Sequence, residues 1–168
     1  MPTTTTRAKE HQKRWDEIVN DPSLRDLPYK VETNHRGQIV LSPHTNRHTF
    51  QQKAVQKKLD ELLSGGEAFQ ELAIATSGGT KQADVVWSSD DRMAEMRETG
   101  DPTTLAPEIC VEVLSSSNTE EEIREKRGLY FESGAEEVWV VDKEGRVRFF
   151  GQEEMKASEL VPEFPDQL

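Results

Sequence analysis

Cysteine and long hydrophobic runs are the two features that this sequence has least of. Its single cysteine, Cys110, cannot form a disulfide within the chain, and its apolar neighbours indicate a small core residue rather than a nucleophile. Nowhere do 18 consecutive apolar residues occur, and residues 1–10 contain no apolar segment typical of an export signal. We therefore expect no membrane span and a location in the reducing cytoplasm.

Positive charge is also scarce. The chain has 21 Lys and Arg residues against 32 Asp and Glu residues, which gives a formal net charge of −11 at pH 7. A negatively charged protein is not drawn over long distances to nucleic acids or to anionic membranes. The composition therefore counts against a protein that binds polyanions simply through its overall charge.

The rest of the composition fits one folded domain with a modest core. Hydrophobic residues make up 33% of the chain and charged residues 32%, and the hydrophobic residues are grouped in runs, unlike those of a disordered chain. We expect a single domain at residues 27–152. It would follow an N-terminal tail and short helix at residues 1–26 and precede a C-terminal tail at residues 153–168.

Hydrophobic spacing and turn signals predict a series of hairpins and helices. In chain order they predict a helix at 9–19, a hairpin at 29–41, a helix at 50–63, a hairpin at 68–87, a short helix at 89–96, a strand at 109–114, a helix at 120–133 and a hairpin at 138–150. This order predicts an α/β fold with a mixed central β-sheet, flanking α-helices and an N-terminal hairpin.

Two carboxylates lie within apolar strands. Glu112 lies in the run 109–114, whose β-branched residues indicate a strand buried on both faces. A carboxylate in such a strand costs several kcal/mol unless a cation or a hydrogen-bond donor meets it. Asp84 lies near the start of a shorter apolar run at 83–87, although an acid there also suits a strand edge or a turn. Two acids on buried strands suggest a shared metal ion.

One lysine projects toward the core from the last long helix. Projected at about 100° per residue, Ile123, Tyr130 and Phe131 define the buried face of that helix. Lys126 falls within the same arc, so we expect its side chain to point inward. The other interpretation pairs Lys126 with Glu122, one turn earlier, as a partly exposed ion pair.

Six segments resemble, in their order and spacing, those of the Uma-two family of small endonucleases, within the restriction-endonuclease-like PD-(D/E)XK superfamily. They read LPYKVETNHRGQIVLSP, NRH, QADVVWSS, PEICVEVLSSSN, EKRGLYFESGAEEVWVVD and GRVRFF. The resemblance extends over roughly residues 27–150. It implies an α/β/α core in which an aspartate and a glutamate on adjacent strands hold a divalent metal, which activates water to hydrolyse a phosphodiester bond.

The resemblance also implies roles for individual residues. Asp84 falls on the family's aspartate and Glu112 on its glutamate, and both are implied metal ligands. The backbone carbonyl of Val113 is a candidate third ligand. Mg²⁺ or Mn²⁺ is the implied cofactor, because both ions take oxygen ligands. The family usually has proline before the aspartate, whereas this chain has Ala83, a change that removes no ligand.

The implied catalytic lysine lies outside the usual motif. The superfamily pattern places a lysine two residues after the glutamate, where this chain has Leu114. The Uma-two pattern looks like one in which the lysine has moved to the following helix, and Lys126 occupies that place. Glu32 matches a glutamate of a related subgroup and is a candidate third acid at the metal. The candidate catalytic residues are Asp84, Glu112, Lys126 and Glu32.

These features predict a metal-dependent endonuclease that acts on nucleic acid, with DNA as the expected substrate. The basic residues form only one modest patch around the helix at 50–63, so we expect weak affinity. They are Arg36, Arg47, Lys53, Lys57 and Lys58. A homodimer would join two such patches into one groove. The alternative function is a catalytically inactive, dimeric interaction module on a nuclease fold.

Overall fold

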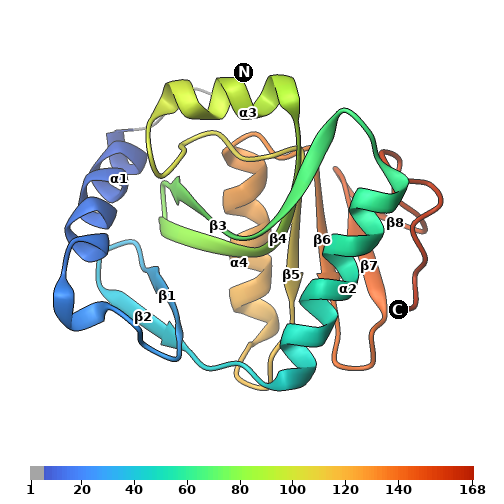
Figure 1. Ribbon diagram of the computed structural model, residues 1–168, viewed down its shortest axis with the longest axis horizontal. Helices are drawn as coiled ribbons and strands as arrows, with labels where there is room; N and C mark the ends of the chain where they lie inside the picture. Colours follow the sequence, from blue (N-terminus) through green and yellow to red (C-terminus); the bar gives the residue numbers. More distant parts are fainter. Residues whose placement is uncertain (1–5) are drawn as a thin grey trace.

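The helices and strands follow the order that the sequence predicts. The computed structural model describes residues 6–168 (Figure 1), so residues 1–5 of the expected N-terminal tail lie outside the described residues. The elements are α1 (Thr6–Val19), the 3-10 helix η1 (Pro22–Leu24), β1 (Lys30–Thr33), β2 (Ile39–Ser42), α2 (Asn46–Leu62), β3 (Gly66–Thr76), β4 (Gly79–Ser89), α3 (Asp90–Thr99), β5 (Ile109–Val113), α4 (Glu120–Glu132), β6 (Glu137–Val141), β7 (Val147–Phe150) and β8 (Glu154–Met155). Within residues 6–168, no helix combines the length and the apolar character needed to cross a membrane.

Six strands form one mixed sheet in the order β3-β4-β5-β6-β7-β8. β5 and β6 are parallel, and the other neighbouring strands are antiparallel. β1 and β2 form a separate antiparallel hairpin, whose turn places Gly37 at a φ of +75°, a conformation that suits glycine. This topology confirms the predicted α/β fold with a mixed central sheet and an N-terminal hairpin.

The two main helices cover opposite faces of the sheet. In Figure 1, α2 lies in front of the strands and α4 behind them. Val55 of α2 packs with Val111 of β5 on one face, whereas Tyr130 of α4 packs with Cys110 on the other. Because side chains alternate along a strand, Glu112 shares the α4 face with Cys110. Cys110 is fully buried, as predicted, and burial raises the pKa of its thiol well above the ordinary value.

The segment after residue 152 packs against the end of the sheet. It supplies the short edge strand β8, and it places Val161 and Phe164 in the core. The ring centroids of Phe164 and Trp139 lie 4.6 Å apart. Residues 153–168, which the sequence suggests as a C-terminal tail, therefore contribute side chains to the main hydrophobic cluster. No helical or strand periodicity marks them, because only isolated residues of the segment are buried.

A buried carboxylate holds this segment in place. Glu137 is 3% exposed, and its Oε1 accepts hydrogen bonds from Trp139 Nε1 at 2.8 Å and from Ser158 Oγ at 2.6 Å. Its Oε2 accepts from the backbone N–H groups of Glu159 at 3.0 Å and Leu160 at 2.8 Å. One side chain thus joins β6 to the C-terminal segment through four donors.

Replacing Glu137 with alanine is expected to lower the free energy of unfolding by about 3 kcal/mol, because the four donors lose their acceptor and some of them stay buried. Urea unfolding followed by tryptophan fluorescence would measure the change. Glu136→Ala is the matched control, since Glu136 is the exposed neighbour and its loss should change stability by less than about 0.5 kcal/mol. Equal effects of the two substitutions would show that the carboxylate does not hold the segment.

Candidate active site

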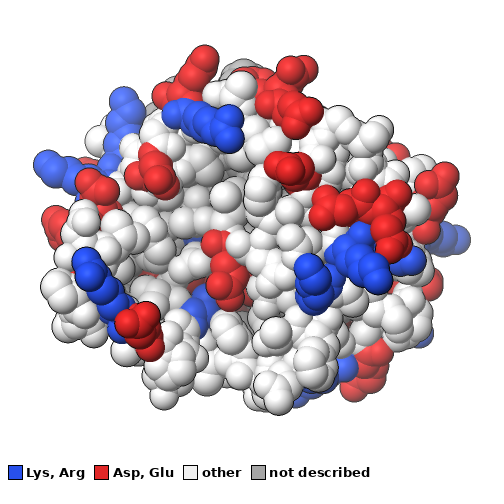
Figure 2. Space-filling view, viewed as in Figure 1, with Lys and Arg blue, Asp and Glu red and all other residues white. Residues whose placement is uncertain are grey.

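One pocket collects the residues that the sequence singles out. It has a volume of about 350 Å³ and lies between the β1–β2 hairpin, the start of α2 and α4. Figure 2 shows a hollow near the middle of this face, with acidic and basic atoms at its bottom. The pocket lining includes Glu32, Asp84, Glu112, Val113 and Lys126. Five positions from four separate elements therefore meet in one place.

The N-terminal hairpin brings two charged residues to this pocket. The backbone N–H of Gln82 in β4 donates to Glu32 Oε2 at 2.8 Å, and the side-chain amide of Gln82 donates to the Val31 carbonyl at 2.8 Å. These bonds hold β1 against β4. Because Lys30 lies two residues before Glu32 on the same strand, both side chains point to the same side.

The pairing of β3 with β4 is interrupted at Asp84. β3 and β4 pair in the same register on both sides of this point, and Glu71 and Asp84, which lie opposite each other, are not paired. Glu71 has a φ of 55°, which is uncommon for a residue other than glycine. The free carbonyl of Asp84 accepts a hydrogen bond from Nε2 of Gln52, a buried residue of α2, at 2.9 Å. The interruption falls at the position from which the Asp84 carboxylate enters the pocket.

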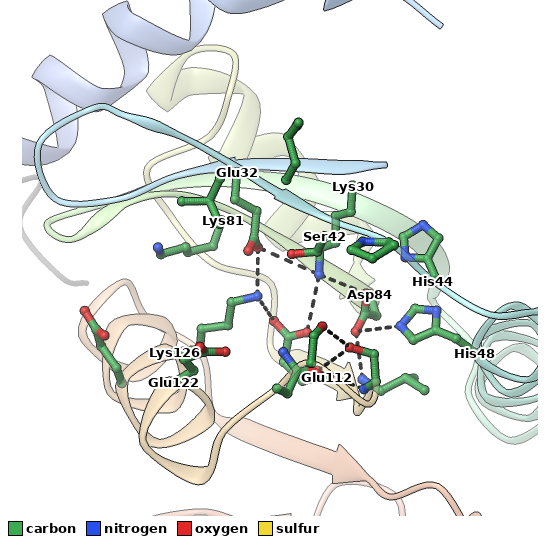
Figure 3. Close-up of a pocket in the computed structure, with 18 residues that line it drawn as sticks. Lys30, Glu32, Ser42, His44, His48, Lys81, Asp84, Glu112, Glu122 and Lys126 are labelled. Atoms are coloured by element: carbon green, nitrogen blue, oxygen red, sulfur yellow. Dashed lines mark hydrogen bonds and ion pairs between the residues drawn. The ribbon is translucent and has the colours of Figure 1, made fainter. Parts of the chain in front are cut away.

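Two lysines join the three carboxylates into one buried group, the ion cluster of Lys30, Glu32, Asp84, Glu112 and Lys126. Lys30 Nζ lies 2.9 Å from Asp84 Oδ1 and 3.6 Å from Glu112 Oε2. It also lies 3.7 Å from Glu32 Oε2. Lys126 Nζ lies 2.9 Å from Glu32 Oε2 and 3.1 Å from Glu112 Oε1. Figure 3 shows both ammonium groups directed at the carboxylates.

The position of Lys126 distinguishes the two interpretations of this residue. Its side chain is 12% exposed and points inward, as the helical projection predicts. In residues 6–168, its ion pairs join it to Glu32 and Glu112. Glu122 instead accepts a hydrogen bond from the backbone N–H of Thr119 and completes a capping box at the start of α4. The expected alternative, a surface pair of Lys126 with Glu122, is not formed.

Uncharged and backbone donors complete the contacts of the two central acids. The Tyr130 hydroxyl donates to Glu112 Oε1 at 2.6 Å. The backbone N–H of Val113 donates to Asp84 Oδ2 at 2.8 Å, and His48 Nε2 lies 3.5 Å from the same oxygen. Both acids are thus fixed in place by neighbours from α2, α4 and the sheet.

Burial and charge act in opposite directions on the ionisation of the cluster. Burial opposes the charge of Asp84, but the Lys30 ammonium and a hydrogen bond with His48 outweigh it and hold the pKa of Asp84 well below the ordinary value. At Glu112 burial dominates and raises the pKa to about 7, despite Lys126 and Lys30. Burial also opposes the charge of Lys30, yet the nearby carboxylates raise its pKa well above the ordinary value. Near neutral pH, Asp84 is therefore ionised, Glu112 is partly protonated, and Lys30 is charged.

Three residues of this site were missed in the sequence. Lys30 is only 8% exposed, and its spacing of two residues from Glu32 on a short strand was the available signal. Tyr130 was assigned to the core, where it lies, but its hydroxyl also binds Glu112. His48, in the first turn of α2, belongs to the NRH segment of the family resemblance, but no role at the site was predicted for it. All three contacts join segments far apart in the chain, which periodicity does not report.

The cluster suits a divalent cation in the chemistry of its donor atoms. Mg²⁺ and related hard cations prefer carboxylate and carbonyl oxygens, and three carboxylates converge here. In the part of the chain that the structure describes, however, no group of three or more His, Cys, Asp or Glu side chains is arranged to hold a metal ion. Instead, the Lys30 ammonium contacts both predicted ligands, Asp84 and Glu112. The carboxylate oxygens of Asp84 and Glu112 are thus of the kind that such a cation prefers, and the Lys30 ammonium lies between them.

The fold and the site together define the structural class of this protein. A mixed α/β sheet that carries acids on two neighbouring strands, with a lysine from the following helix against them, is a restriction-endonuclease-like arrangement. The chain belongs to the Uma2 family, described as "Putative restriction endonuclease", which matches residues 21–168. The family resemblance seen in the sequence is thereby confirmed.

A solved structure shares the fold. It is the crystal structure of a "putative nuclease belonging to DUF820" from Anabaena variabilis, with a TM-score of 0.66 and 19% sequence identity. The similarity covers 83% of this chain and 81% of that chain. At this identity the likeness concerns the fold, and it confirms the nuclease-like architecture. A comparison with curated proteins gave no match.

Proposed function

We propose that this protein is a metal-dependent endonuclease that hydrolyses phosphodiester bonds in DNA. The observation that carries the proposal is the contact of Lys126 with Glu112, at 3.1 Å, in a pocket that Asp84 also lines. Two acids and a lysine in one open pocket provide the negative oxygens that hold a metal and the positive charge that faces a phosphate. Membership in the Uma2 family supports the same class of reaction.

Mg²⁺ or Mn²⁺ is the proposed cofactor. The carboxylates of Asp84 and Glu112 and the carbonyl of Val113 would hold it. When bound, the cation supplies a coordinated water of lowered pKa and neutralises charge on the phosphate. A ligand set of this size leaves coordination positions for water and substrate.

Lys126 is proposed to stabilise the negative charge that develops on the phosphate. Glu32 positions this lysine, because Glu32 Oε2 accepts a hydrogen bond from Lys126 Nζ at 2.9 Å. Burial opposes the charge of Lys126, but Glu112 and Glu32 raise its pKa above the ordinary value. The side chain therefore acts as a fixed cation rather than as a base.

The surface for DNA is small in one protomer. Figure 2 shows basic side chains over α2 with acidic side chains directly beside them. The net charge of −11 adds long-range repulsion of the phosphate backbone. We propose that a homodimer joins two of these patches into one groove, and that binding of DNA remains weak.

Binding of duplex DNA is expected to depend only mildly on salt. Few phosphates are neutralised, so the slope of log K against log salt concentration should correspond to about two to four phosphate contacts. Fluorescence anisotropy of a labelled duplex over a series of KCl concentrations would measure the slope. Tight binding with a steep slope would contradict the proposed weak, acidic surface.

Incubation of purified protein with supercoiled plasmid tests the proposed function. Parallel reactions would contain Mg²⁺, Mn²⁺ or EDTA, and a structured RNA would replace the plasmid in a second set. We expect nicking of the plasmid with either metal, none with EDTA, and slower cleavage of RNA. A folded dimer that cleaves neither substrate with either metal would favour the dimeric interaction module.

A further inference from the structure

Lys30 is the one cluster residue, among those that the structure describes, without a part in the proposed reaction. Its side chain is 6% exposed, and its ammonium lies among three carboxylates. The closest is Asp84, whose Oδ1 accepts a hydrogen bond from Lys30 Nζ at 2.9 Å. A buried lysine with three acidic neighbours in a candidate active site calls for a role of its own.

The charges of the cluster nearly balance without a metal. Three carboxylates and two ammonium groups lie within ion-pair distance of one another in the cluster. Buried carboxylates that lacked these cations would be strongly destabilising. The two lysines therefore neutralise the buried carboxylates in the metal-free protein, as a divalent cation would in the metal-loaded protein.

Lys30 and a metal ion would compete for the same oxygens. The ammonium contacts Asp84 and Glu112, which are the two carboxylates of the proposed metal site. Lys126 differs, because its ion pairs are with Glu32 and Glu112 and leave Asp84 to Lys30. A cation bound to Asp84 would displace Lys30 and leave the Lys126–Glu32 contact in place.

We propose that Lys30 is a built-in counter-cation that holds the metal position in the metal-free protein, leaves Asp84 when a divalent cation binds, and thereby sets the affinity for that cation. This inference rests on the proposed metal site. Glu32 is the acceptor for the displaced ammonium. Its Oε2 lies 3.7 Å from Lys30 Nζ, and both residues belong to β1. Metal binding is then an exchange of one cation for another, and the site loads only when the free metal outcompetes the lysine.

Binding of Mn²⁺ to the full chain tests this exchange without any measurement of activity. Electron paramagnetic resonance of free Mn²⁺ and calorimetry would give the affinities of wild type, Lys30→Met and Lys126→Met. Removal of the competing ammonium should raise the affinity of Lys30→Met by about tenfold or more, within the usual range of coupling between two binding events. Lys126→Met is the matched comparison, since it removes the same charge from the same cluster but contacts only Glu112 of the two proposed ligands. Its affinity should therefore rise less than that of Lys30→Met, by about threefold at most.

Lys30→Arg keeps the positive charge in case Lys30→Met folds poorly. Its planar group can hold a carboxylate through two hydrogen bonds, so it should bind Mn²⁺ more weakly than wild type. Equal affinities of wild type and both Lys30 variants, or an equal rise in Lys126→Met, would overturn the exchange while leaving the metal site and the nuclease proposal intact. Absence of Mn²⁺ binding in wild type and in folded Lys30→Met would overturn the exchange together with the proposed metal site.

Discussion

Replacing Asp84 with asparagine is expected to abolish metal-dependent cleavage of DNA, with a fall on the order of 10³-fold or more. The amide keeps the size of the side chain but removes the negative charge that would hold the metal. It also removes the charge that pairs with the Lys30 ammonium, which lies 2.9 Å from Asp84 Oδ1. Single-turnover nicking of supercoiled plasmid in Mg²⁺ and in Mn²⁺ would measure the change.

Loss of activity in this variant has to be separated from loss of folding. Breaking a buried ion pair destabilises a protein by about 3–5 kcal/mol. Circular dichroism and urea unfolding would establish that Asp84→Asn is folded at the assay temperature. Asp91→Asn, at an exposed aspartate in the first turn of α3, is the matched control and should cleave like wild type. A folded Asp84→Asn protein with the wild-type rate would place catalysis elsewhere.

Replacing Lys126 with alanine is expected to slow cleavage by about 10²–10³-fold while metal affinity stays close to that of wild type. The ammonium is not a metal ligand, and the size of the loss is that of removing one preorganised charge from a developing oxyanion. Glu32 and Glu112 both lose a partner, so a moderate loss of stability should accompany the loss of rate. Plasmid nicking and Mn²⁺ calorimetry on the same preparation would measure both quantities.

Lys156→Ala, at an exposed lysine, is the control for Lys126→Ala. It removes one positive charge from the surface and should leave cleavage unchanged. If Lys126 only holds the cluster together, Lys126→Ala would be less stable but would cleave at the wild-type rate whenever it is folded. That outcome would remove Lys126 from the catalytic machinery.

The sequence predicted those parts of the site that lie within regular elements. Glu112 was found because a carboxylate in an apolar strand needs a partner, and Lys126 because the helical projection turns it inward. The structure places both in one pocket with Asp84 and Glu32. The order of strands and helices followed from the same periodicities.

Strand and helix periodicities do not predict contacts between distant segments. Lys30 belongs to a short hairpin, and only the packing of that hairpin on β4 brings its ammonium to Asp84. The interrupted pairing at Glu71 and Asp84 is also a property of two strands together, since neither strand alone shows where it falls. The C-terminal segment was missed for a related reason, because Val161 and Phe164 enter the core without any repeating pattern. These features depend on tertiary packing, which overrides local preference.

Diffraction from crystals grown with Mn²⁺, recorded where manganese scatters anomalously, tests most directly whether Asp84 and Glu112 share one cation. The account predicts one anomalous peak in the pocket, with oxygens of both carboxylates at about 2.1 Å. It also predicts that Lys30 Nζ has left its position 2.9 Å from Asp84 Oδ1. A pocket without a peak, with Lys30 still bound to Asp84 in crystals saturated with Mn²⁺, would contradict it.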